Sequence, residues 1–255
     1  MTTEAVTQER ATEQLSGPKL ILLSLLPGAM AVVFHLLAPP VVERLAAPPV
    51  LTILLGNALF IALFELGYML FQGRRITGKF SLKGVVLYRE PLPWWQYVVL
   101  IIVLLAWGFV VGAVMTPVST ALRETTFAWM PSVFTADPAA LDPSLYSQSA
   151  LVVTFVFALV FTGIAIPITE EFYYRGFLLP RISRLGWLAP VVNVVLWAIN
   201  HFFQPWNIIS FALIFLPLAF VVWWKKNVYV SAVGHVIANL MLVLPMAAWL
   251  VGGAP

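Results

Sequence analysis

The sequence predicts an all-α fold, a polytopic bundle of transmembrane helices. Of its 255 residues, 61% are hydrophobic and only 10% are charged, and the apolar residues gather in long runs. A soluble globular domain carries about 25% charged residues, whereas a helix that crosses a bilayer needs about 20 consecutive apolar residues. The bilayer is therefore the expected surroundings of the chain.

Seven apolar runs have about the length that a membrane span requires. They cover about residues 20–42, 50–71, 95–117, 149–179, 187–204, 206–224 and 228–251. Only the tripeptide QPW separates the fifth run from the sixth. Residues 118–134 are an alternative eighth piece, re-entrant or interfacial. We expect residues 1–19 to be a polar tail and residues 20–255 to form one membrane-embedded domain.

Basic residues are distributed unevenly between the two sides that these spans define. Twelve Lys and Arg residues fall on the side of the N-terminus, and only Arg44 and Arg123 fall on the other. Cytoplasmic loops are enriched in Lys and Arg, so we expect a cytoplasmic N-terminus. The first nineteen residues are polar and contain three glutamates, unlike a signal peptide. We expect an integral protein of a bacterial inner membrane.

The composition also excludes several kinds of function. The chain has no cysteine, which excludes disulfides, thiolate nucleophiles and cysteine-ligated zinc. The net charge is +3, but the basic residues flank apolar runs and form no continuous stripe. We therefore expect the lipid bilayer, and no nucleic acid, as a partner.

Few polar residues remain inside the predicted spans, and all three histidines are among them. An ionisable residue near the middle of a bilayer costs about 2.5–3.5 kcal/mol, so each needs a polar partner or water. The set is His35, Asn57, Glu65, Glu170, Glu171, Arg175, Asn193, Asn200, His201, His235 and Asn239.

The spacing of these residues predicts which of them meet. Glu171 and Arg175 are four residues apart and should form an ion pair on one helical face. Glu170 is rotated by about 100° from Glu171 and has no such partner. It lies about as far before the turn at Leu185–Gly186 as His201 lies after it, about 23 Å at 1.5 Å per residue. An antiparallel helix pair would therefore bring Glu170 level with His201.

The last span offers a second pair, because His235 and Asn239 are also four residues apart on one face. Three helices are thus expected to present Glu170, His201, His235 and Asn239 to one polar cavity. Taken singly, each of these residues is also explained by structure alone, as a buried ion pair or as hydrogen bonds between helices.

The remaining polar residues carry structural expectations. Asn193 and Asn200, seven residues apart, are expected to join helices by hydrogen bonds. His35 and Glu65 are expected to be structural, with Glu65 paired to a basic residue of the 72–94 region.

Three segments together resemble a known family. ITEEFYYRG, LWAINHFF and GHVIANL match, in order, the EExxxR, FxxxH and HxxxN motifs of the CPBP family. These intramembrane proteases are related to CAAX prenyl endopeptidases and are also labelled Abi. Trp197 stands where phenylalanine is usual. The resemblance covers about residues 160–245 and implies a catalytic core at about 149–245.

The resemblance also implies roles for individual residues. Glu170 and His201 would activate a water, His235 and Asn239 would stabilise the oxyanion, and Glu171 and Arg175 would support the site. The reaction would be hydrolysis of a peptide bond in a membrane-associated protein or peptide, at a site open toward the cytoplasm.

Zinc is the alternative to a metal-free site, because one carboxylate and two imidazoles are a plausible zinc set. The two-histidine helix motif HExxH is absent. The amide of Asn239 is a poor zinc ligand and a good hydrogen-bond donor. We therefore favour a glutamate mechanism without a cofactor.

Two other functions compete with proteolysis. A small ion- or proton-coupled transporter would use the glutamates and histidines as a pathway, although the sequence shows no internal repeat. A non-catalytic, immunity-type membrane protein of the same fold is the third hypothesis. The substrate and the oligomeric state cannot be read from the sequence.

Overall fold

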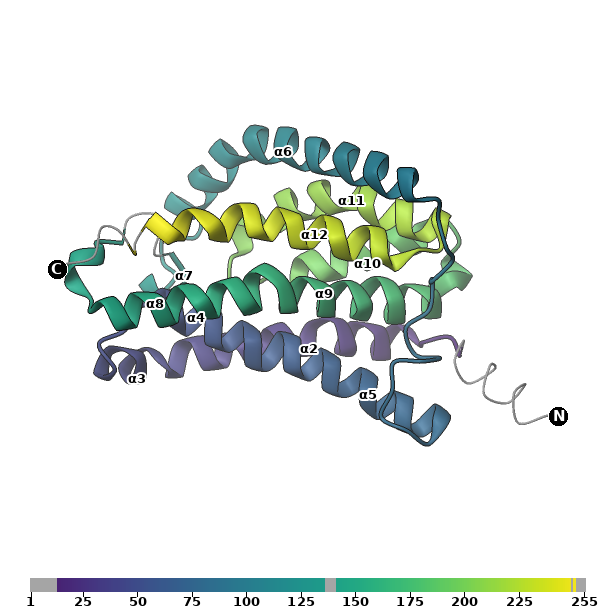
Figure 1. Ribbon diagram of the computed structural model, residues 1–255, viewed down its shortest axis with the longest axis horizontal. Coiled ribbons are helices and arrows are strands. Elements are labelled where there is room, and N and C mark those ends of the chain that lie inside the picture. The colour runs from purple at the N-terminus through teal and green to yellow at the C-terminus, as the bar shows by residue number, and fades with distance from the viewer. Residues whose placement is uncertain (1–12, 136–140, 249, 251–255) are drawn as a thin grey trace.

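The computed structural model describes residues 13–135, 141–248 and 250, and these form a bundle of helices (Figure 1). Within the described residues the only extended pairing is one isolated bridge, between Arg89 and Asn227. Six helical stretches are long and apolar enough to cross a membrane: Gly17–Leu37, Val50–Thr77, Trp94–Glu124, Gln148–Leu185, Pro205–Lys225 and Val228–Ala248. The predicted all-α membrane bundle is confirmed.

Several of the six stretches combine segments of different helical geometry. The first half of the chain contains α2 (Gly17–Leu37), α3 (Pro39–Arg44), α4 (Val50–Gly56), η1 (Asn57–Ala62), α5 (Leu63–Thr77), α6 (Trp94–Glu124) and α7 (Ser132–Thr135). The second half contains η3 (Pro143–Leu145), α8 (Gln148–Phe157), η4 (Ala158–Ala165), α9 (Ile166–Glu170), η5 (Glu171–Leu178), η6 (Leu179–Leu185), α10 (Leu188–Asn200), η7 (Pro205–Asn207), α11 (Ile208–Lys225), α12 (Val228–Val243) and η8 (Leu244–Ala248).

The fifth predicted span is shorter than expected. Helix α10 has 13 residues, about 20 Å at 1.5 Å per residue, which is less than the roughly 30 Å of a hydrocarbon core. It ends at Asn200, and Pro205 then starts η7. The turn between α10 and α11 therefore lies inside the depth of the bundle. Residues 118–124 continue α6 beyond Pro117, and α7 (Ser132–Thr135) follows, so residues 118–134 form no span of their own, and an interfacial piece there stays a prediction.

The expected polar tail is shorter than residues 1–19. Helix α2 begins at Gly17. Leu15 is buried, and its backbone N–H donates a hydrogen bond to the carbonyl of Arg181 at 2.9 Å. Residues 1–12 lie outside the described residues. The start of the folded bundle is thus anchored to the end of the long helix Gln148–Leu185.

Most basic side chains gather at one end of the bundle, which we call the basic end. Helices α2, α6, α10 and α12 begin there, and α5, η6 and α11 end there (Figure 1). The segment after α5 crosses this end, where Leu87 N–H donates to Gly176 and Val228 N–H donates to Tyr88. The described Lys and Arg residues of the basic end are Lys19, Arg74, Arg75, Lys79, Lys83, Arg89, Arg181, Arg184, Lys225 and Lys226.

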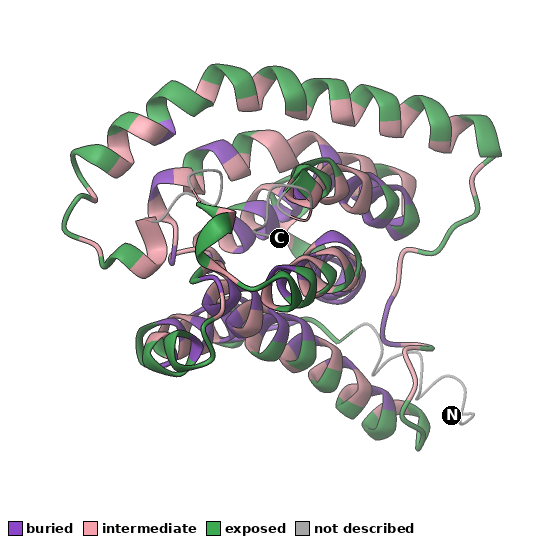
Figure 2. Ribbon diagram, turned by 60° about the vertical axis from the view of Figure 1, so that its left-hand side comes forward, coloured by how far each residue is buried: buried purple, intermediate pink, exposed green. Residues whose placement is uncertain are grey.

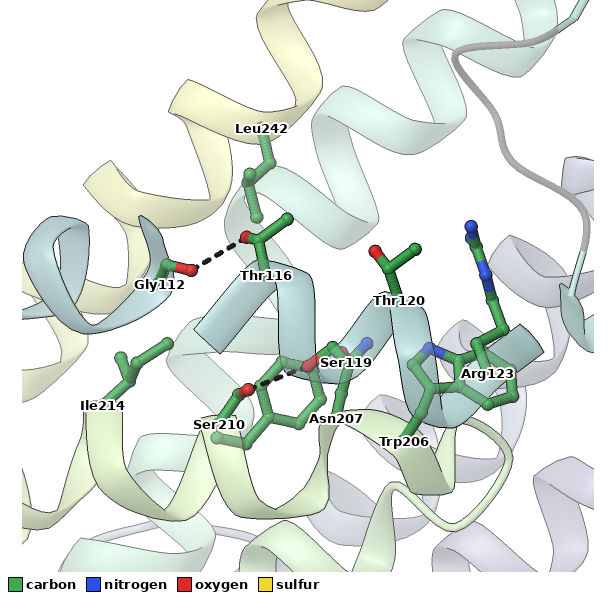
Figure 3. Close-up of a pocket in the computed structure, with 11 residues that line it drawn as sticks. Gly112, Thr116, Ser119, Thr120, Arg123, Trp206, Asn207, Ser210, Ile214 and Leu242 are labelled. Carbon is green, nitrogen blue, oxygen red and sulfur yellow. Dashed lines mark hydrogen bonds between the residues drawn. The ribbon is translucent and has the colours of Figure 1, made fainter. Parts of the chain in front are cut away.

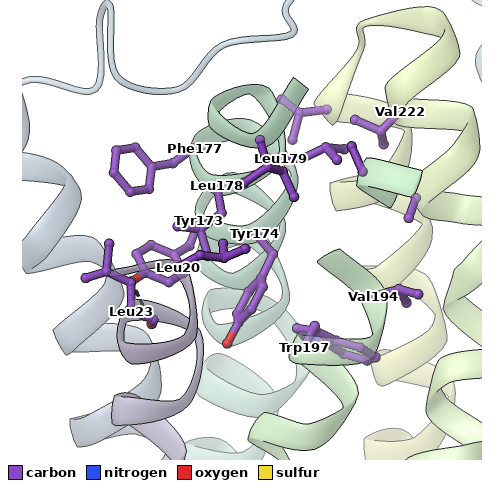
Figure 4. Packing of buried hydrophobic residues seen from close by; sticks show 14 of the residues in the cluster. Leu20, Leu23, Tyr173, Tyr174, Phe177, Leu178, Leu179, Val194, Trp197 and Val222 are labelled. Carbon is purple, nitrogen blue, oxygen red and sulfur yellow. Dashed lines mark hydrogen bonds between the residues drawn. The ribbon is translucent and has the colours of Figure 1, made fainter. Parts of the chain in front are cut away.

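Burial separates the site region from the periphery. The largest buried cluster joins the long helix Gln148–Leu185 to α2, α10 and α11, and it includes Tyr173, Leu178 and Trp197 (Figure 4). Helix α6, in contrast, has Ser119 as its one buried residue, and the rest of its length is exposed or intermediate (Figure 2). Its exposed side chains include the apolar Trp94, Val103 and Phe109. Such a surface suits contact with lipid.

Candidate active site

The two adjacent glutamates lie at a change of helical geometry. Glu170 ends α9 and Glu171 begins η5, and both η5 and η4 are π-helical segments. π-Helical turns are rare and occur frequently at functional sites. Both carboxyl groups are buried, at 2% exposure for Glu170 and 0% for Glu171. Because consecutive helical residues point in different directions, the two carboxyl groups meet different partners.

Glu170 faces His201, as the hairpin spacing predicts. Its Oε1 lies 3.7 Å from Nε2 of His201, the first residue after α10. The Nδ1 atom of His201 lies 2.9 Å from the backbone carbonyl of Trp197. A carbonyl oxygen can only accept a hydrogen bond, so Nδ1 carries the hydrogen. In the neutral ring, Nε2 then directs its lone pair toward Glu170.

Trp197 contacts both Glu170 and His201, which we did not predict from the sequence. Its indole Nε1 donates to Oε1 of Glu170 at 3.3 Å, and its ring centroid lies 4.6 Å from that of His201 and 5.9 Å from that of His235. The sequence signal was present, since a buried tryptophan N–H needs an acceptor. The departure from phenylalanine in the FxxxH motif thus adds a donor to the site.

Glu171 joins two of the predicted site residues. Its Oε2 lies 3.4 Å from Nε of Arg175, which confirms the expected ion pair, and its Oε1 lies 3.0 Å from Nδ1 of His235. The guanidinium carbon of Arg175 lies over the rings of Trp197 and Phe215, at 4.9 and 5.9 Å. Cation–π contacts of this kind stabilise a cation that is removed from water. The bond from Glu171 to His235 was not foreseen.

Asn239 is one helical turn beyond His235 on α12 and is half-buried. Its Nδ2 donates to the carbonyl of Thr162 in η4 at 2.8 Å, which leaves a second N–H on the same nitrogen. Among the described residues, no hydrogen bond links Asn239 to Glu170, His201 or His235. The common polar cavity expected for the four residues therefore stays a prediction.

The predicted pairing of Glu65 with a basic residue of the 72–94 region was wrong. Glu65 is fully buried on α5, and within the described residues its carboxyl oxygens have no hydrogen-bond partner. Burial is the main influence on this carboxyl group, and Glu170, Arg175 and Glu171 are the charged residues near enough to act on it. Because α5 packs this face against α9 and η5, Glu65 points toward the site and away from the 72–94 region.

His35 has the structural setting that was expected for it. The ring is fully buried and makes edge contacts with Phe134 and Phe203, at centroid distances of 5.8 and 5.3 Å. It fills the space beside Gly56, where a Cβ atom would lie 2.3 Å from its Nε2. His35 therefore packs α2 against α4.

Interhelical hydrogen bonds hold the helices that carry the site. Asn200 Oδ1 accepts from the N–H of Gly28 at 2.8 Å, and Asn193 donates to the carbonyl of Tyr174 at 2.9 Å, which confirms the expected role of both. The hydroxyls of Tyr173 and Tyr174, both labelled in Figure 4, donate to the backbone carbonyls of Leu23 and Ser24. The two tyrosines of the EExxxR segment thus fix η5 to α2, a role that their sequence positions did not reveal.

A cavity of about 350 Å³ lies between the last turns of α6 and the first turns of α11 (Figure 3). Its lining is partly polar and includes the hydrogen-bonded pair Ser119 and Ser210, at 3.0 Å. Phe211 also lines it, and the Phe211 ring lies 5.2 Å from that of His201. This cavity is at the end opposite the basic end.

The donor set does not fit a catalytic zinc, which usually takes three protein ligands. Across the described residues, no three His, Asp or Glu side chains are grouped as metal ligands. The Nδ1 atoms of His201 and His235 are hydrogen-bonded to Trp197 and Glu171, an arrangement that histidines have with or without a metal on Nε2, so the absence of a third grouped ligand among the described residues carries this conclusion. We derive no step through a metal.

Comparison with known proteins bears on this geometry. The family model described as type II CAAX prenyl endopeptidase Rce1-like matches residues 152–241. This match supports membership of the CPBP family of CAAX proteases. It contains Glu170, His201, His235 and Asn239, and at the family level it supports an intramembrane endopeptidase. Neither the search of curated proteins nor that of solved structures returned a match.

Proposed function

We propose that this member of the CPBP family hydrolyses a peptide bond of a membrane-associated protein or peptide, by a glutamate mechanism without a metal. The observation that carries the proposal is the pair Glu170 and His201. Their facing atoms, a carboxylate oxygen and an imidazole nitrogen, lie 3.7 Å apart. This separation is too long for a direct hydrogen bond, and both atoms are acceptors when the ring is neutral. A water that donates one hydrogen to each satisfies both.

The first chemical step is attack of this water on the substrate carbonyl. Glu170 takes a proton from the water as the oxygen bonds to the carbonyl carbon, and His201 Nε2 orients the water through its second hydrogen. Glu170 then gives the proton to the leaving nitrogen as the C–N bond breaks. The products are a carboxylic acid and an amine, and Glu170 returns to its starting form.

The negative charge on the carbonyl oxygen needs donors during this step. Asn239 supplies the second N–H of its amide. His235 is the second donor, through Nε2, and its Nδ1 lies 3.0 Å from Oε1 of Glu171. Arg175 holds the Glu171 carboxylate from the other side, so that the acceptor stays directed at His235.

The proposal places the protein across the membrane with its N-terminus in the cytoplasm. The basic end supports this orientation, because Lys and Arg are enriched on cytoplasmic sides. The expected opening of the site toward the cytoplasm stays a prediction, since the cavity that Phe211 links to His201 lies at the other end.

The proposal is tested by mapping protein termini in cells that express wild type, Glu170→Gln or Glu43→Gln at equal levels. Glu43 is an exposed acid on α3 and controls for the loss of one carboxylate. We expect a set of new termini with wild type and Glu43→Gln that is missing with Glu170→Gln. The same termini in all three strains would refute the proposal, provided that Glu170→Gln inserts and unfolds like wild type.

A further inference from the structure

A second cavity, of about 380 Å³, opens at the basic end. It lies between the start of α2, the last turns of α5 and the end of the long helix Gln148–Leu185. Its lining includes three basic residues, Lys19, Arg75 and Arg181, and one acid, Glu13. None of these residues belongs to the proposed catalytic site. The excess of positive charge in a cavity favours an anionic occupant.

Arg181 is the most constrained of the three basic residues. It is only 3% exposed, and its Nη1 donates to the carbonyls of Val85 and Phe177, at 3.1 and 2.7 Å. Its guanidinium carbon lies 4.1 Å from the ring centroid of Phe177. The group is therefore fixed in position and orientation by contacts on one nitrogen and one face.

The other terminal nitrogen of Arg181 is buried without a hydrogen-bond partner in the described part of the chain. A buried donor that lacks an acceptor is costly, and more so when it is charged. Arg181 is one of the residues that line the cavity, so an anion that enters the cavity and reaches this nitrogen would provide the acceptor. Planar guanidinium groups bind the oxygens of phosphate particularly well.

The two exposed cations complete the arrangement from separate helices. Lys19 lies in the first turn of α2, and Arg75 lies in the last turn of α5. Both side chains are exposed, whereas that of Arg181 is buried. Leu15, Ile76 and Phe177 add apolar lining beside the charges. A phosphate that carries a glycerol and acyl chains matches this mixture better than a bare ion does.

We propose that this cavity binds the phosphate of an anionic phospholipid headgroup, with the free nitrogen of Arg181 as the fixed donor and Lys19 and Arg75 closing over it. The site would tie α2 and α5 to the long helix that carries Glu170. The proposal stands independently of the proposed proteolysis.

The test measures thermal unfolding of the full-length protein in detergent during titration with phosphatidylglycerol, phosphatidylcholine or inorganic phosphate. Native mass spectrometry of the same samples counts the lipids retained. The variants are Lys19→Gln/Arg75→Gln and Arg181→Lys, which keeps the charge and removes the planar donor. Lys79→Gln/Lys83→Gln is the matched control, because it removes two exposed charges at the basic end outside the cavity.

We expect phosphatidylglycerol to raise the unfolding temperature of wild type and of the control, and phosphatidylcholine to have little effect. Lys19→Gln/Arg75→Gln should weaken the apparent affinity for phosphatidylglycerol about tenfold, and Arg181→Lys should weaken it as well. An equal loss in the control, or full binding by Arg181→Lys, would overturn the site. Equal stabilisation by inorganic phosphate would overturn the lipid as its ligand and leave free phosphate.

Discussion

The indole Nε1 of Trp197 lies 3.3 Å from Oε1 of Glu170, and the backbone carbonyl of Trp197 lies 2.9 Å from Nδ1 of His201. One residue therefore contacts both members of the proposed water-activating pair. The side chain orients the acid and the main chain fixes the hydrogen on the imidazole. Phenylalanine, usual at this place in the motif, would keep the second contact and lose the first.

We predict that Trp197→Phe lowers kcat/KM about tenfold, because a hydrogen bond to a charged group contributes about 1.5–3 kcal/mol and this one is long. An aromatic ring stays, so the contacts with His201 and His235 are largely kept, whereas the smaller ring leaves space in a buried site and should lower the stability moderately. The measurement is cleavage of a substrate found by terminus mapping. Trp187→Phe, at an exposed tryptophan, is the control and should have wild-type activity. A loss above a thousandfold would show that the indole does more than orient Glu170.

The ion pair of Glu171 and Arg175 is completely buried. Replacing both residues should therefore cost less stability than the sum of the two single replacements. Replacing only one partner leaves an uncompensated charge in the core, which costs about 3–5 kcal/mol. We predict that Arg175→Met and Glu171→Gln each lower the unfolding temperature strongly.

The double variant Glu171→Gln/Arg175→Met should recover most of the lost stability, since paired removal of a buried ion pair is often neutral. The amide oxygen of the glutamine can still accept from His235, but the counter-ion is gone, so activity should remain low. Thermal unfolding and cleavage assays on the same samples separate the two effects. If the unfolding temperature of the double variant falls by as much as those of the two single variants together, this account is contradicted.

The sequence predicted what depends on helical spacing. The pair Glu171–Arg175 and the equal depth of Glu170 and His201 follow from 3.6 residues per turn and 1.5 Å per residue. The roles of Asn193 and Asn200 follow from the need of buried amides for partners. These relations are either within one helix or across one short turn, so the chain itself fixes them.

Contacts between segments far apart in the chain could not be predicted in the same way. The bond from Glu171 to His235 and the inward direction of Glu65 depend on how α12 and α5 are rotated about their axes. Hydropathy says little about rotation when a helix is apolar on every side. Likewise, α10 ends at Asn200 because the chain turns at His201. The sequence did not show this end, since residues 187–204 form one continuous apolar run.

The orientation across the membrane can be tested directly because the chain has no native cysteine. We predict that Glu43→Cys reacts with a membrane-impermeant maleimide in sealed right-side-out vesicles and that Lys79→Cys reacts only after the vesicles are opened. Both positions are exposed, one on α3 and the other at the basic end. The reverse labelling pattern would place the N-terminus outside and would require a different account of the basic end.

Activity should survive metal chelation. A catalytic zinc usually takes three protein ligands, and among the described residues no three His, Asp or Glu side chains are grouped in this way. We predict unchanged cleavage after dialysis against a chelator, with far less than one zinc per chain in elemental analysis. A zinc-dependent protease treated in parallel should lose its activity. Stoichiometric zinc that leaves together with activity would establish the zinc alternative.

The crossing of α2 and α10 offers a test of how the fold positions His201. Gly28 donates its N–H to Asn200, and a Cβ atom at Gly28 would lie 2.1 Å from the backbone oxygen of Asn200. An alanine there must push the end of α10 away from α2. Because His201 follows Asn200 directly, its ring would move relative to Glu170.

We predict that Gly28→Ala lowers both the unfolding temperature and kcat, although Gly28 touches no reacting atom. A displacement of about 1 Å at a reacting group can cost about a hundredfold in rate. Gly67→Ala is the matched control, because Gly67 is an exposed helical glycine with nothing within 4 Å of the added Cβ. That change should leave activity intact and stabilise the helix slightly. If Gly28→Ala destabilises the fold but keeps full kcat, then the position of His201 is set by the Trp197 carbonyl and not by the α2–α10 crossing.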